Sequence, residues 1–284
     1  MEKGGIKMKS KIVLDSSGDL HSFSEADFAC VPLTIHAGER EFVDDETLDR
    51  EEMLAFLQEH KGKSTTSCPG VGDYLQAFGD ADEVFCVTIT SQLSGSYNAA
   101  SVAARTYQEQ HPSSHVHVFD SLSTGPSMIL MAERLRELIR EKLPFEAIVS
   151  AVEAYKRKLK LIFTLESLHN LAANGRVPFA VAAVTGMLGI RVIGRASEEG
   201  KLEVVGKARG EKKLLAHQLM RIRDMGYAGG KLIIQHCENA AGASALAVAL
   251  RDAFPTAKIR IGQTGGLCSF YAERGGMIIG FEAN

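Results

Sequence analysis

The sequence of 284 residues contains no tryptophan and no Cys-x-x-Cys pair. Its five cysteines lie far apart and are odd in number, which supports neither a zinc ribbon nor a disulfide framework. Reduced thiols are the simplest interpretation, and they predict a cytoplasmic protein. The formal net charge is only −3, so the composition gives no reason to expect binding to nucleic acid.

Long apolar runs are also missing. The most apolar stretch, residues 179–190, is too short for a membrane span, which needs about 20 residues. The N-terminus "MEKGGIKMKSKIVLD" carries charge but lacks the apolar core of a signal peptide. Met8 offers a second plausible start, and we expect residues 1–9 to be frayed or disordered.

The common nucleotide and hydrolase motifs are absent as well. No GxxxxGK[ST] loop and no GxGxxG after a strand occur, so the chain shows no sign of binding ATP or a dinucleotide by itself. No GxSxG elbow of a serine hydrolase occurs either. We therefore expect no nucleotide cofactor.

Apolar runs alternate with helical patterns in the first half of the chain. This alternation predicts βαβ units and a mainly parallel sheet between layers of helices. The predicted strands cover 11–15, 28–35, 83–89 and 115–120, and the predicted helices cover 47–60 (capped by Asp45 or Thr47), 71–78, 95–109, a helix from Pro126, and 144–159. Residues 65–70, between two of these elements, are predicted to form a loop.

The second half has a different pattern. A β-hairpin around Glu199 and Gly200 makes its sheet mixed. The predicted strands cover 160–165, 231–237, 257–263 and 275–282, the hairpin covers 190–208, and the predicted helices cover a short helix before Arg176, 179–188, 209–225 and 239–252. We therefore predict an α/β protein of two domains: an N-terminal α/β/α domain at 10–158 with a mainly parallel sheet, and a mixed C-terminal domain at 159–284.

Three loops rich in hydroxyl groups follow apolar strands. They are "DSSGD" at 15–19, "TSQLSG" at 90–95 and "DSLSTG" at 120–125. In open α/β sheets, ligands bind beyond the carboxyl ends of the strands, where such loops would converge. Each loop alone is explained by helix capping, but three together favour a site. Ser94 is the most informative position, because before Gly95 at a helix start its hydroxyl can cap the helix, donate to an anion, or do both.

Other candidates have plain alternatives. Thr66 and Ser67 in "TTSCP" offer hydroxyl donors, or simply stabilise a turn. Arg176, on a turn before an apolar segment, suits an amphiphilic anion, or is a solvated loop arginine. His115 and His117 share one strand face, but no further ligand lies at a useful spacing, so packing is favoured over a metal site.

Seven short segments, in order along most of the chain, carry a family resemblance. They are "LDSSGDL", "VPLTI" followed by "EFVDD", "TSCP", "LSGSYNAA", "FDSLSTG", "ESLHNLAANGRV" and "GKARGEKK". Each is weak alone, but the ordered set resembles the DegV family, the fatty-acid-binding proteins of bacterial fatty acid kinase systems. The resemblance implies a long-chain fatty acid in an apolar tunnel between two domains, with its carboxylate at hydroxyls of the N-terminal domain.

The resemblance also implies roles for individual residues. Thr66 and Ser94 would bind the carboxylate, with Ser67 and Gly95 beside them, and Arg176 would lie near the head group. Members of the family hold the acid while a separate ATP-dependent kinase subunit makes the acyl phosphate. The protein would then have no catalytic residue, metal or cofactor of its own, and its partners would be the fatty acid, the kinase subunit and, transiently, a membrane surface. Arg209, in "KARGEKK", would lie on the kinase interface.

One position departs from the family pattern. The family often carries a histidine in its glycine-rich C-terminal segment, close to the head group. In "FYAERGGMIIGF" this chain has Tyr271 there, followed by Glu273 and Arg274. A tyrosine donates a hydrogen bond but carries no positive charge near neutral pH, so neutralising the carboxylate would fall more heavily on Arg176.

The energetics of a lipid site are simple, but two alternatives stay open. Burial of a tail gives about 0.8 kcal/mol per methylene, or roughly 10 kcal/mol for a dozen before the entropy of binding is subtracted. Residues 179–188 and the strand "MIIGF" are candidate walls of the tunnel. One alternative is a stand-alone phosphotransferase or esterase that uses Ser94 as its nucleophile. The other is a carrier of a different amphiphilic acid, such as a retinoid or sterol acid.

Overall fold

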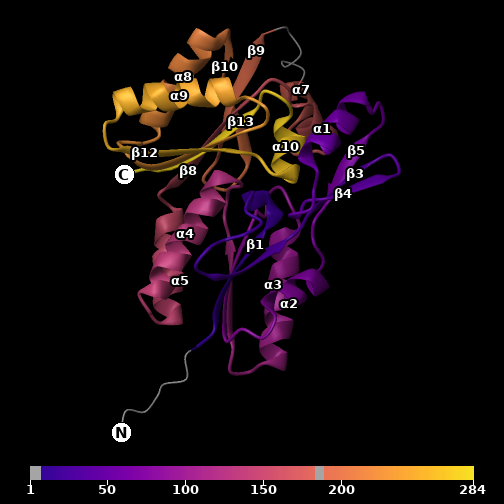
Figure 1. Ribbon diagram of the computed structural model, residues 1–284, viewed down its shortest axis with the longest axis vertical. Coiled ribbons are helices and arrows are strands. Elements are labelled where there is room, and N and C mark those ends of the chain that lie inside the picture. Colours follow the sequence, from indigo (N-terminus) through magenta and orange to yellow (C-terminus); the bar gives the residue numbers. More distant parts are fainter. Residues whose placement is uncertain (1–7, 183–188) are drawn as a thin grey trace.

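The computed structural model describes residues 8–182 and 189–284. Within them the chain forms an N-terminal half (residues 8–158) and a C-terminal half (159–284), which lie one above the other along the long axis (Figure 1). Of the predicted frayed segment, residues 1–7 lie outside the described residues. The prediction is wrong at Lys9, because its backbone N–H donates to the Asp82 carboxylate at 2.8 Å.

Four parallel strands form the first sheet, in the order β2-β1-β6-β7. The strands are β1 (Ser10–Asp15), β2 (Asp27–Val31), β6 (Glu83–Thr88) and β7 (His115–Asp120). Side chains alternate between the two faces of a strand. Ile12 and Leu14 therefore pack on one pair of helices, and Val13 packs on the other pair.

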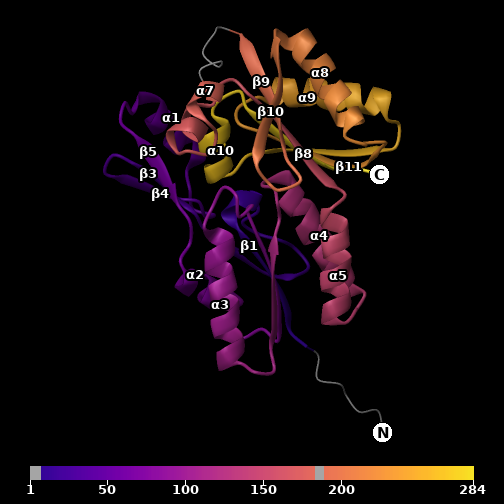
Figure 2. The ribbon, with the colours of Figure 1, turned by 180° about the vertical axis from the view of Figure 1, so that it is seen from behind.

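Two pairs of helices cover this sheet. They are α4 (Pro126–Arg140) and α5 (Phe145–Lys156) on one face, and α2 (Val71–Phe78) and α3 (Ser96–Gln110) on the other. Figure 2 shows α3 and α4 on opposite sides of β1. The predicted α/β/α layering of the N-terminal part is confirmed.

A second, antiparallel sheet corrects two predictions. It has the order β4-β3-β5, with β3 (Thr34–Ala37), β4 (Arg40–Val43) and β5 (Ser64–Ser67). The single strand predicted at 28–35 is two strands in different sheets, since Pro32 cannot donate to a ladder and the Leu33 N–H donates to Ser16 Oγ at 3.0 Å. The loop predicted at 65–70 is partly strand β5, because its β-branched threonines pair with β3.

Helix α1 (Arg50–Glu59) begins later than predicted. The cap is Asp49, whose carboxylate accepts from the Glu52 N–H at 2.9 Å. Asp45, one of the predicted caps, instead accepts from the backbone and side chain of Thr47 at 2.8 and 2.7 Å. The two predicted caps, Asp45 and Thr47, therefore bond each other in a local turn that precedes the helix.

The C-terminal half contains a mixed sheet of six strands, in the order β10-β9-β8-β13-β11-β12. Only β11 and β12 pair in parallel. The strands are β8 (Leu159–Leu165), β9 (Ile190–Ala196), β10 (Leu202–Arg209), β11 (Gly230–His236), β12 (Ala257–Gln263) and β13 (Met277–Glu282). The predicted hairpin and mixed sheet are confirmed, and the domain limits near Lys158 stay a prediction.

The two faces of this sheet have different partners. Helices α8 (Glu211–Asp224) and α9 (Ala240–Ala253) cover one face. The other face shares a core with the N-terminal half, in which Phe163 and Leu165 of β8 join Ile35 of β3 and Met53 of α1. The short helices are η1 (Ser16–Gly18), α6 (His169–Ala173), α7 (Phe179–Ala182) and α10 (Gly266–Ala272). Helix α10 was not predicted, and the predicted helix at 179–188 lies outside the described residues from 183 onward.

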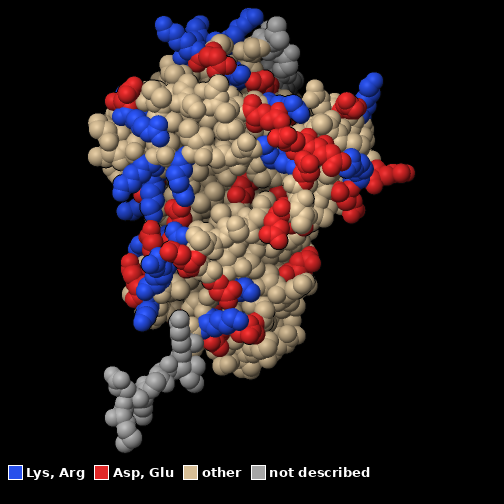
Figure 3. All heavy atoms as spheres, viewed as in Figure 1, with Lys and Arg blue, Asp and Glu red and all other residues tan. Residues whose placement is uncertain are grey.

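Charge is unevenly distributed over the surface. Figure 3 shows acidic side chains gathered over β3, β4 and α1, where Glu39, Glu41, Glu51 and Glu52 are exposed. In the described parts of the chain, no helix combines the length and the apolar character that crossing a membrane requires.

Candidate functional site

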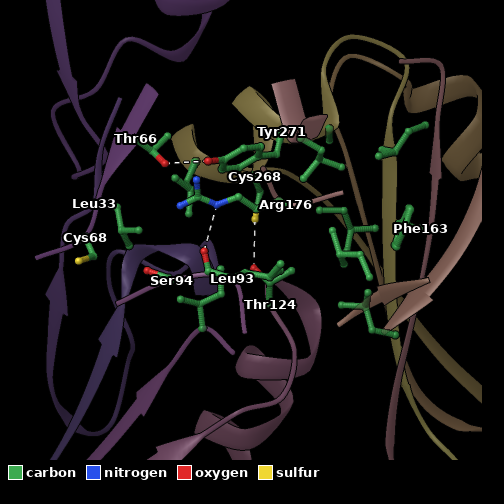
Figure 4. Close-up of a pocket in the computed structure, with 18 of the residues that line it drawn as sticks. Leu33, Thr66, Cys68, Leu93, Ser94, Thr124, Phe163, Arg176, Cys268 and Tyr271 are labelled. Atoms are coloured by element: carbon green, nitrogen blue, oxygen red, sulfur yellow. Dashed lines mark hydrogen bonds between the residues drawn. The ribbon is translucent and has the colours of Figure 1, made fainter. Parts of the chain in front are cut away.

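A cavity of about 310 Å³ lies between the two halves (Figure 4). Polar groups and Arg176 gather at one end, and Phe163 lies at the other. The lining includes all six residues predicted to bind a ligand, namely Thr66, Ser67, Ser94, Gly95, Arg176 and Tyr271. The remaining lining residues are Leu33, Cys68, Ile89, Leu93, Thr124, Leu161, Leu165, Leu171, Leu202, Leu267, Cys268, Ala272 and Ile278 together with Phe163. The structure thus brings the six together, while their individual roles stay predictions.

Strand pairing places Thr66 toward the cavity. Thr66 lies opposite Ile35 in the antiparallel pair of β5 and β3, so both side chains are on the same face of the sheet. Ile35 is fully buried, which makes this the face that packs against the core. Ser67 is on the other face, where its hydroxyl bonds His36 Nε2 at 2.8 Å.

Ser94 lies just before helix α3, whose N-cap is Gly95. Its hydroxyl oxygen accepts from the Ser96 N–H at 3.3 Å and bonds the Ser96 hydroxyl at 3.0 Å. Ser94 therefore satisfies one backbone group at the helix start, as the capping interpretation requires. Ser94 also lines the cavity, beside the N-terminus of a 15-residue helix, where the helix dipole favours an anion.

A local turn places Arg176. Helix α6 ends in a Schellman motif: the Gly175 N–H donates to the Ala172 carbonyl at 2.9 Å, and the Arg176 N–H donates to the Leu171 carbonyl at 2.8 Å. Gly175 has a φ of 72°, which favours glycine. Asn174 then ties the turn to β5, donating to the Ser64 carbonyl at 3.1 Å.

Among the described residues, the guanidinium of Arg176 has hydrogen-bond partners for only two of its five N–H groups. Nε donates to the Leu93 carbonyl at 3.1 Å (Figure 4). A terminal nitrogen donates to the Asn174 carbonyl at 2.5 Å. In the described part of the chain, no carboxylate lies within 4 Å of this half-buried cation. A guanidinium has five N–H donors, so this positive charge can still bind an anion at the polar end of the cavity.

Tyr271 reaches the same end from helix α10. Its hydroxyl bonds Thr66 Oγ1 at 2.7 Å. Two hydroxyls that share one hydrogen bond use one of their two protons, so the other can be donated to a ligand. Burial raises the pKa of Tyr271, outweighing the lowering effects of the Thr66 bond and the Arg176 charge, so the phenol stays neutral near pH 7.

Strand β8, which we did not predict as part of the site, supplies three residues of the apolar wall. Leu161, Phe163 and Leu165 alternate along this strand and line the cavity. The ring of Phe163 lies against Gly194 of β9, where an added Cβ would come within 2.0 Å of Phe163 Cζ. The two-residue spacing of apolar residues in "KLIFTL" is the sequence signal that could have predicted this wall. Ile278 of the predicted wall strand 277–281 also lines the cavity, whereas most of the predicted wall at 179–188 lies outside the described residues.

The role of the cysteines was also missed, and Thr124 was predicted only as part of the loop 120–125. The five cysteines are free thiols, and Cys68 and Cys268 line the cavity. Thr124 Oγ1 donates to the Ser17 carbonyl at 3.1 Å and lies 3.7 Å from Cys268 Sγ (Figure 4). Helix α10, the element that carries Cys268, has no capping signal in its own sequence, which explains why this contact was not predicted.

The prediction that three hydroxyl-rich loops form one pocket wall is wrong in part. The loop 90–95 lines the cavity, and the loop 120–125 supplies only Thr124. The loop 15–19 does not line it, and the side chains of Asp15 and Ser16 bind protein backbone instead. Asp15 accepts from the N–H groups of Ser17 at 3.2 Å and of Ile89 at 2.8 Å, and its burial raises its pKa to about 6.

The remaining candidates lie elsewhere. Arg209 is exposed at the end of β10, outside the cavity lining. His117 Nε2 lies 3.7 Å from a carboxylate oxygen of Glu153, and the His115 ring packs on Phe145. Among the described residues, no group of three or more histidine, cysteine, aspartate or glutamate side chains is arranged to hold a metal ion.

Comparison with known proteins gives the same family throughout. A family model described as "Uncharacterised protein, DegV family" matches residues 9–284. A DegV domain-containing protein of Streptococcus pneumoniae is 42% identical over 279 residues, covering 97% of this chain and 99% of the relative. A crystal structure of a DegV family protein from Eubacterium eligens, loaded with heptadecanoic acid, has a TM-score of 0.95 and 48% identity, covering 97% of this chain and all of that one.

A second solved structure is equally similar in fold. The Fatty Acid Kinase (Fak) B3 protein of Streptococcus pneumoniae, loaded with linoleic acid, has a TM-score of 0.95 and 42% identity, covering 98% of this chain and 100% of that one. Similarity at this level extends over both halves and the cavity between them. The chain therefore belongs to the DegV family.

Proposed function

We propose that this protein binds a long-chain fatty acid and presents its carboxylate to a separate ATP-dependent kinase subunit. The tail lies along Phe163 and Leu165, and the carboxylate binds at Thr66, Ser94 and Arg176. The observation that carries the proposal is the Arg176 cation, which has donors to spare at the polar end of an otherwise apolar cavity. Relatives with the same fold were solved with heptadecanoic acid and linoleic acid.

The two ends of the ligand have different tasks. Burial of the tail supplies the affinity, at about 0.8 kcal/mol per methylene. The carboxylate would cost several kcal/mol if it were buried without partners. Two hydroxyls, the N-terminus of α3 and the Arg176 guanidinium offset this cost. They also fix the carboxylate at one end, where an oxygen can accept a phosphoryl group.

The surroundings of Ser94 argue against a nucleophilic role. Its hydrogen-bond partner is another serine, Ser96, which is no base. Among the described residues that line the cavity there is no histidine. A serine nucleophile needs an adjacent base, so we assign Ser94 to binding.

The kinase docks, in this proposal, on a basic surface that includes Arg209. Lys207, Arg209, Lys212 and Lys213 are exposed, and none has a carboxylate within 4 Å in the described part of the chain. Figure 3 shows basic side chains projecting above α8. Such a patch steers an acidic partner and speeds its association. The name of the Fak B3 relative assigns that protein to a fatty acid kinase.

We further propose a cytoplasmic location with brief contact at a membrane surface. Phe179, at the start of α7, is 73% exposed, and an exposed phenylalanine is a side chain that can insert at a membrane surface. Its replacement by serine should reduce sedimentation with phospholipid vesicles. Unchanged sedimentation would contradict the membrane contact without affecting the lipid site.

Mass spectrometry of lipid extracted from the purified protein tests the main proposal. We expect a long-chain fatty acid in the extract, no turnover of an ester or acyl substrate by the wild type, and weaker fatty acid binding in Ser94→Ala. A protein that yields no fatty acid and binds none from a panel of chain lengths would refute it. Competition by retinoid and sterol acids decides whether another amphiphilic acid is preferred. Arg209→Glu should leave lipid affinity unchanged and slow acyl-phosphate formation with the kinase.

A further inference from the structure

Two acidic residues from motifs that the lipid cavity does not use meet at helix α10. Asp44 follows strand β4 directly and is fully buried. Asp19 follows η1, and both oxygens of its carboxylate are shielded from solvent. Both belong to the N-terminal half, whereas α10 belongs to the C-terminal half. The contact therefore joins parts of the chain more than 200 residues apart.

Asp44 supplies the cap that α10 lacks in its own sequence. The N-cap of α10 is Gly265, which has no side chain to accept a hydrogen bond. The Asp44 carboxylate accepts from the Gly266 N–H at 2.7 Å and from the Leu267 N–H at 3.0 Å. One carboxylate thus satisfies two of the free N–H groups at the helix start and complements the helix dipole.

Asp44 is itself fixed to the N-terminal half. Its N–H donates to the Leu33 carbonyl at 2.9 Å. His21 Nε2 lies 3.2 Å from the Asp44 carbonyl oxygen and 3.4 Å from its carboxylate. The carboxylate that caps α10 is therefore held in place by two segments of the N-terminal half.

Two glycines allow this close approach. An added Cβ on Gly266 would lie 2.4 Å from Leu48 Cδ2 and 2.7 Å from the Asp44 carboxylate. An added Cβ on Gly265 would lie 2.8 Å from the Asp19 carboxylate. A larger residue at either position would force Leu48, the Asp44 or Asp19 carboxylate, or α10 itself to shift. Glycine at both positions, 265 and 266, therefore leaves the room that this contact needs.

Helix α10 carries part of the head-group end of the cavity. Leu267, Cys268, Tyr271 and Ala272 all line it. The helix packs on η1, β3 and α1, which are elements of the N-terminal half. Tyr271 lies five residues from the capped Gly266, or about 7.5 Å along the helix at 1.5 Å per residue. A shift at the capped end would move its hydroxyl relative to Thr66.

We propose that Asp44 is a positioning residue for the lipid site: by capping α10 from the other half of the protein, it holds the Tyr271 hydroxyl at Thr66. Asp44 contacts no lipid and acts through the helix. Its effect on lipid affinity depends on the proposed function, whereas the docking of α10 does not. The buried neighbour Asp19 lies beside the N-cap residue Gly265, but the Gly266 and Leu267 N–H groups donate to Asp44 and not to Asp19.

The first measurement needs no lipid. Hydrogen–deuterium exchange of peptides that cover 265–272 is compared among the wild type, Asp44→Ala and Asp45→Asn. We expect faster exchange at the start of α10 in Asp44→Ala only. Asp45→Asn is the matched control, because it removes one acidic group at the next position and leaves α10 untouched. Unchanged exchange in Asp44→Ala would overturn the docking role.

The second measurement separates positioning from general stability. Fatty acid affinity is measured for Asp44→Ala in the wild-type background and in Tyr271→Phe. We expect at most about a fivefold loss in the first background, the same as for loss of the Tyr271 hydroxyl, and almost none in the second. Equal losses in both would overturn the proposal. If Asp44→Ala does not fold, Asp44→Asn, which keeps one oxygen for the α10 amides, serves in both experiments. Absence of lipid binding by the wild type would refute the proposed function, while the exchange data would still decide the docking of α10.

Discussion

Replacing Arg176 by methionine should weaken the binding of a fatty acid far more than that of the matching fatty alcohol. Methionine keeps an unbranched apolar stem and removes the cation. Two guanidinium N–H groups already donate to the carbonyls of Leu93 and Asn174, which leaves the others for a carboxylate. The acid needs that charge, whereas the alcohol needs only the apolar cavity and a hydroxyl partner.

The size of the effect follows from the burial of the cation. Removing one partner of a fully buried ion pair costs about 3–5 kcal/mol. Arg176 is half-buried, so water compensates in part and the lower end applies. About 3 kcal/mol corresponds to a loss of roughly a hundredfold in affinity. For the alcohol we expect a loss of less than about threefold, because no charge is left unpaired.

Isothermal titration with an acid and an alcohol of equal chain length measures both losses. Arg176→Lys should fall between the wild type and Arg176→Met, because lysine keeps a charge but not the planar fork. Arg105→Met, an exposed arginine on α3, controls for the loss of a cation far from the cavity. Equal losses for acid and alcohol would refute the reasoning, since they would mean that Arg176 only supports the fold.

Three further predictions concern the rest of the site. Gly194→Ala places a Cβ where the Phe163 ring lies and forces the ring into the cavity. Titration with fatty acids of different chain lengths should show long acids binding about tenfold more weakly and shorter acids less affected. An equal loss at all chain lengths would argue against a ring that blocks the tail end of the cavity. Tyr271→Phe removes the bond to Thr66 and should weaken fatty acid binding about fivefold, the value of one hydrogen bond; Tyr271→His should recover it, and no change in Tyr271→Phe would exclude the hydroxyl from the site. Burial, and then the charge of Asp44, raise the pKa of Asp19 to about 8, with Cys268 and His21 also facing it. The folded state therefore keeps a proton that the unfolded state releases at lower pH, and the free energy of unfolding should fall by up to about 1.4 kcal/mol per pH unit up to that pKa. Urea unfolding between about pH 6 and 8 should show that the free energy of unfolding of Asp19→Asn depends less on pH than that of the wild type, by the equivalent of up to one proton. An unchanged pH dependence would contradict the raised pKa of Asp19.

The parts of the site predicted from sequence are those fixed by local chemistry. "ANGR" contains the glycine that a Schellman motif needs, and this motif alone determines where the Arg176 backbone leaves helix α6. Ser94 and Gly95 lie at a helix start that the local sequence pattern predicts correctly to within one residue. In both cases the residues that determine the geometry lie within a few positions of the functional side chain.

The parts that were missed depend on distant partners. Strand β5 is a strand because β3 pairs with it, and "TTS" alone also fits a turn. Helix α10 takes its cap from Asp44, a residue of the other half. The period of "KLIFTL" predicts a strand, but which face meets the cavity depends on Gly194 and the N-terminal half. Such contacts are absent from any short window of sequence.

The head-group end of the cavity is divided between the halves, and this has a thermodynamic consequence. Thr66 and Ser94 come from the N-terminal half, whereas Arg176 and Tyr271 come from the C-terminal half. A carboxylate bound to both sets would bridge them, so part of its binding free energy would stabilise the contact between the halves. Ligand binding raises the stability of the folded state by RT ln(1 + [L]/Kd). Variants that weaken this bridge, such as Arg176→Met, should therefore show a smaller increase in melting temperature with a fatty acid than the wild type shows at the same ligand concentration.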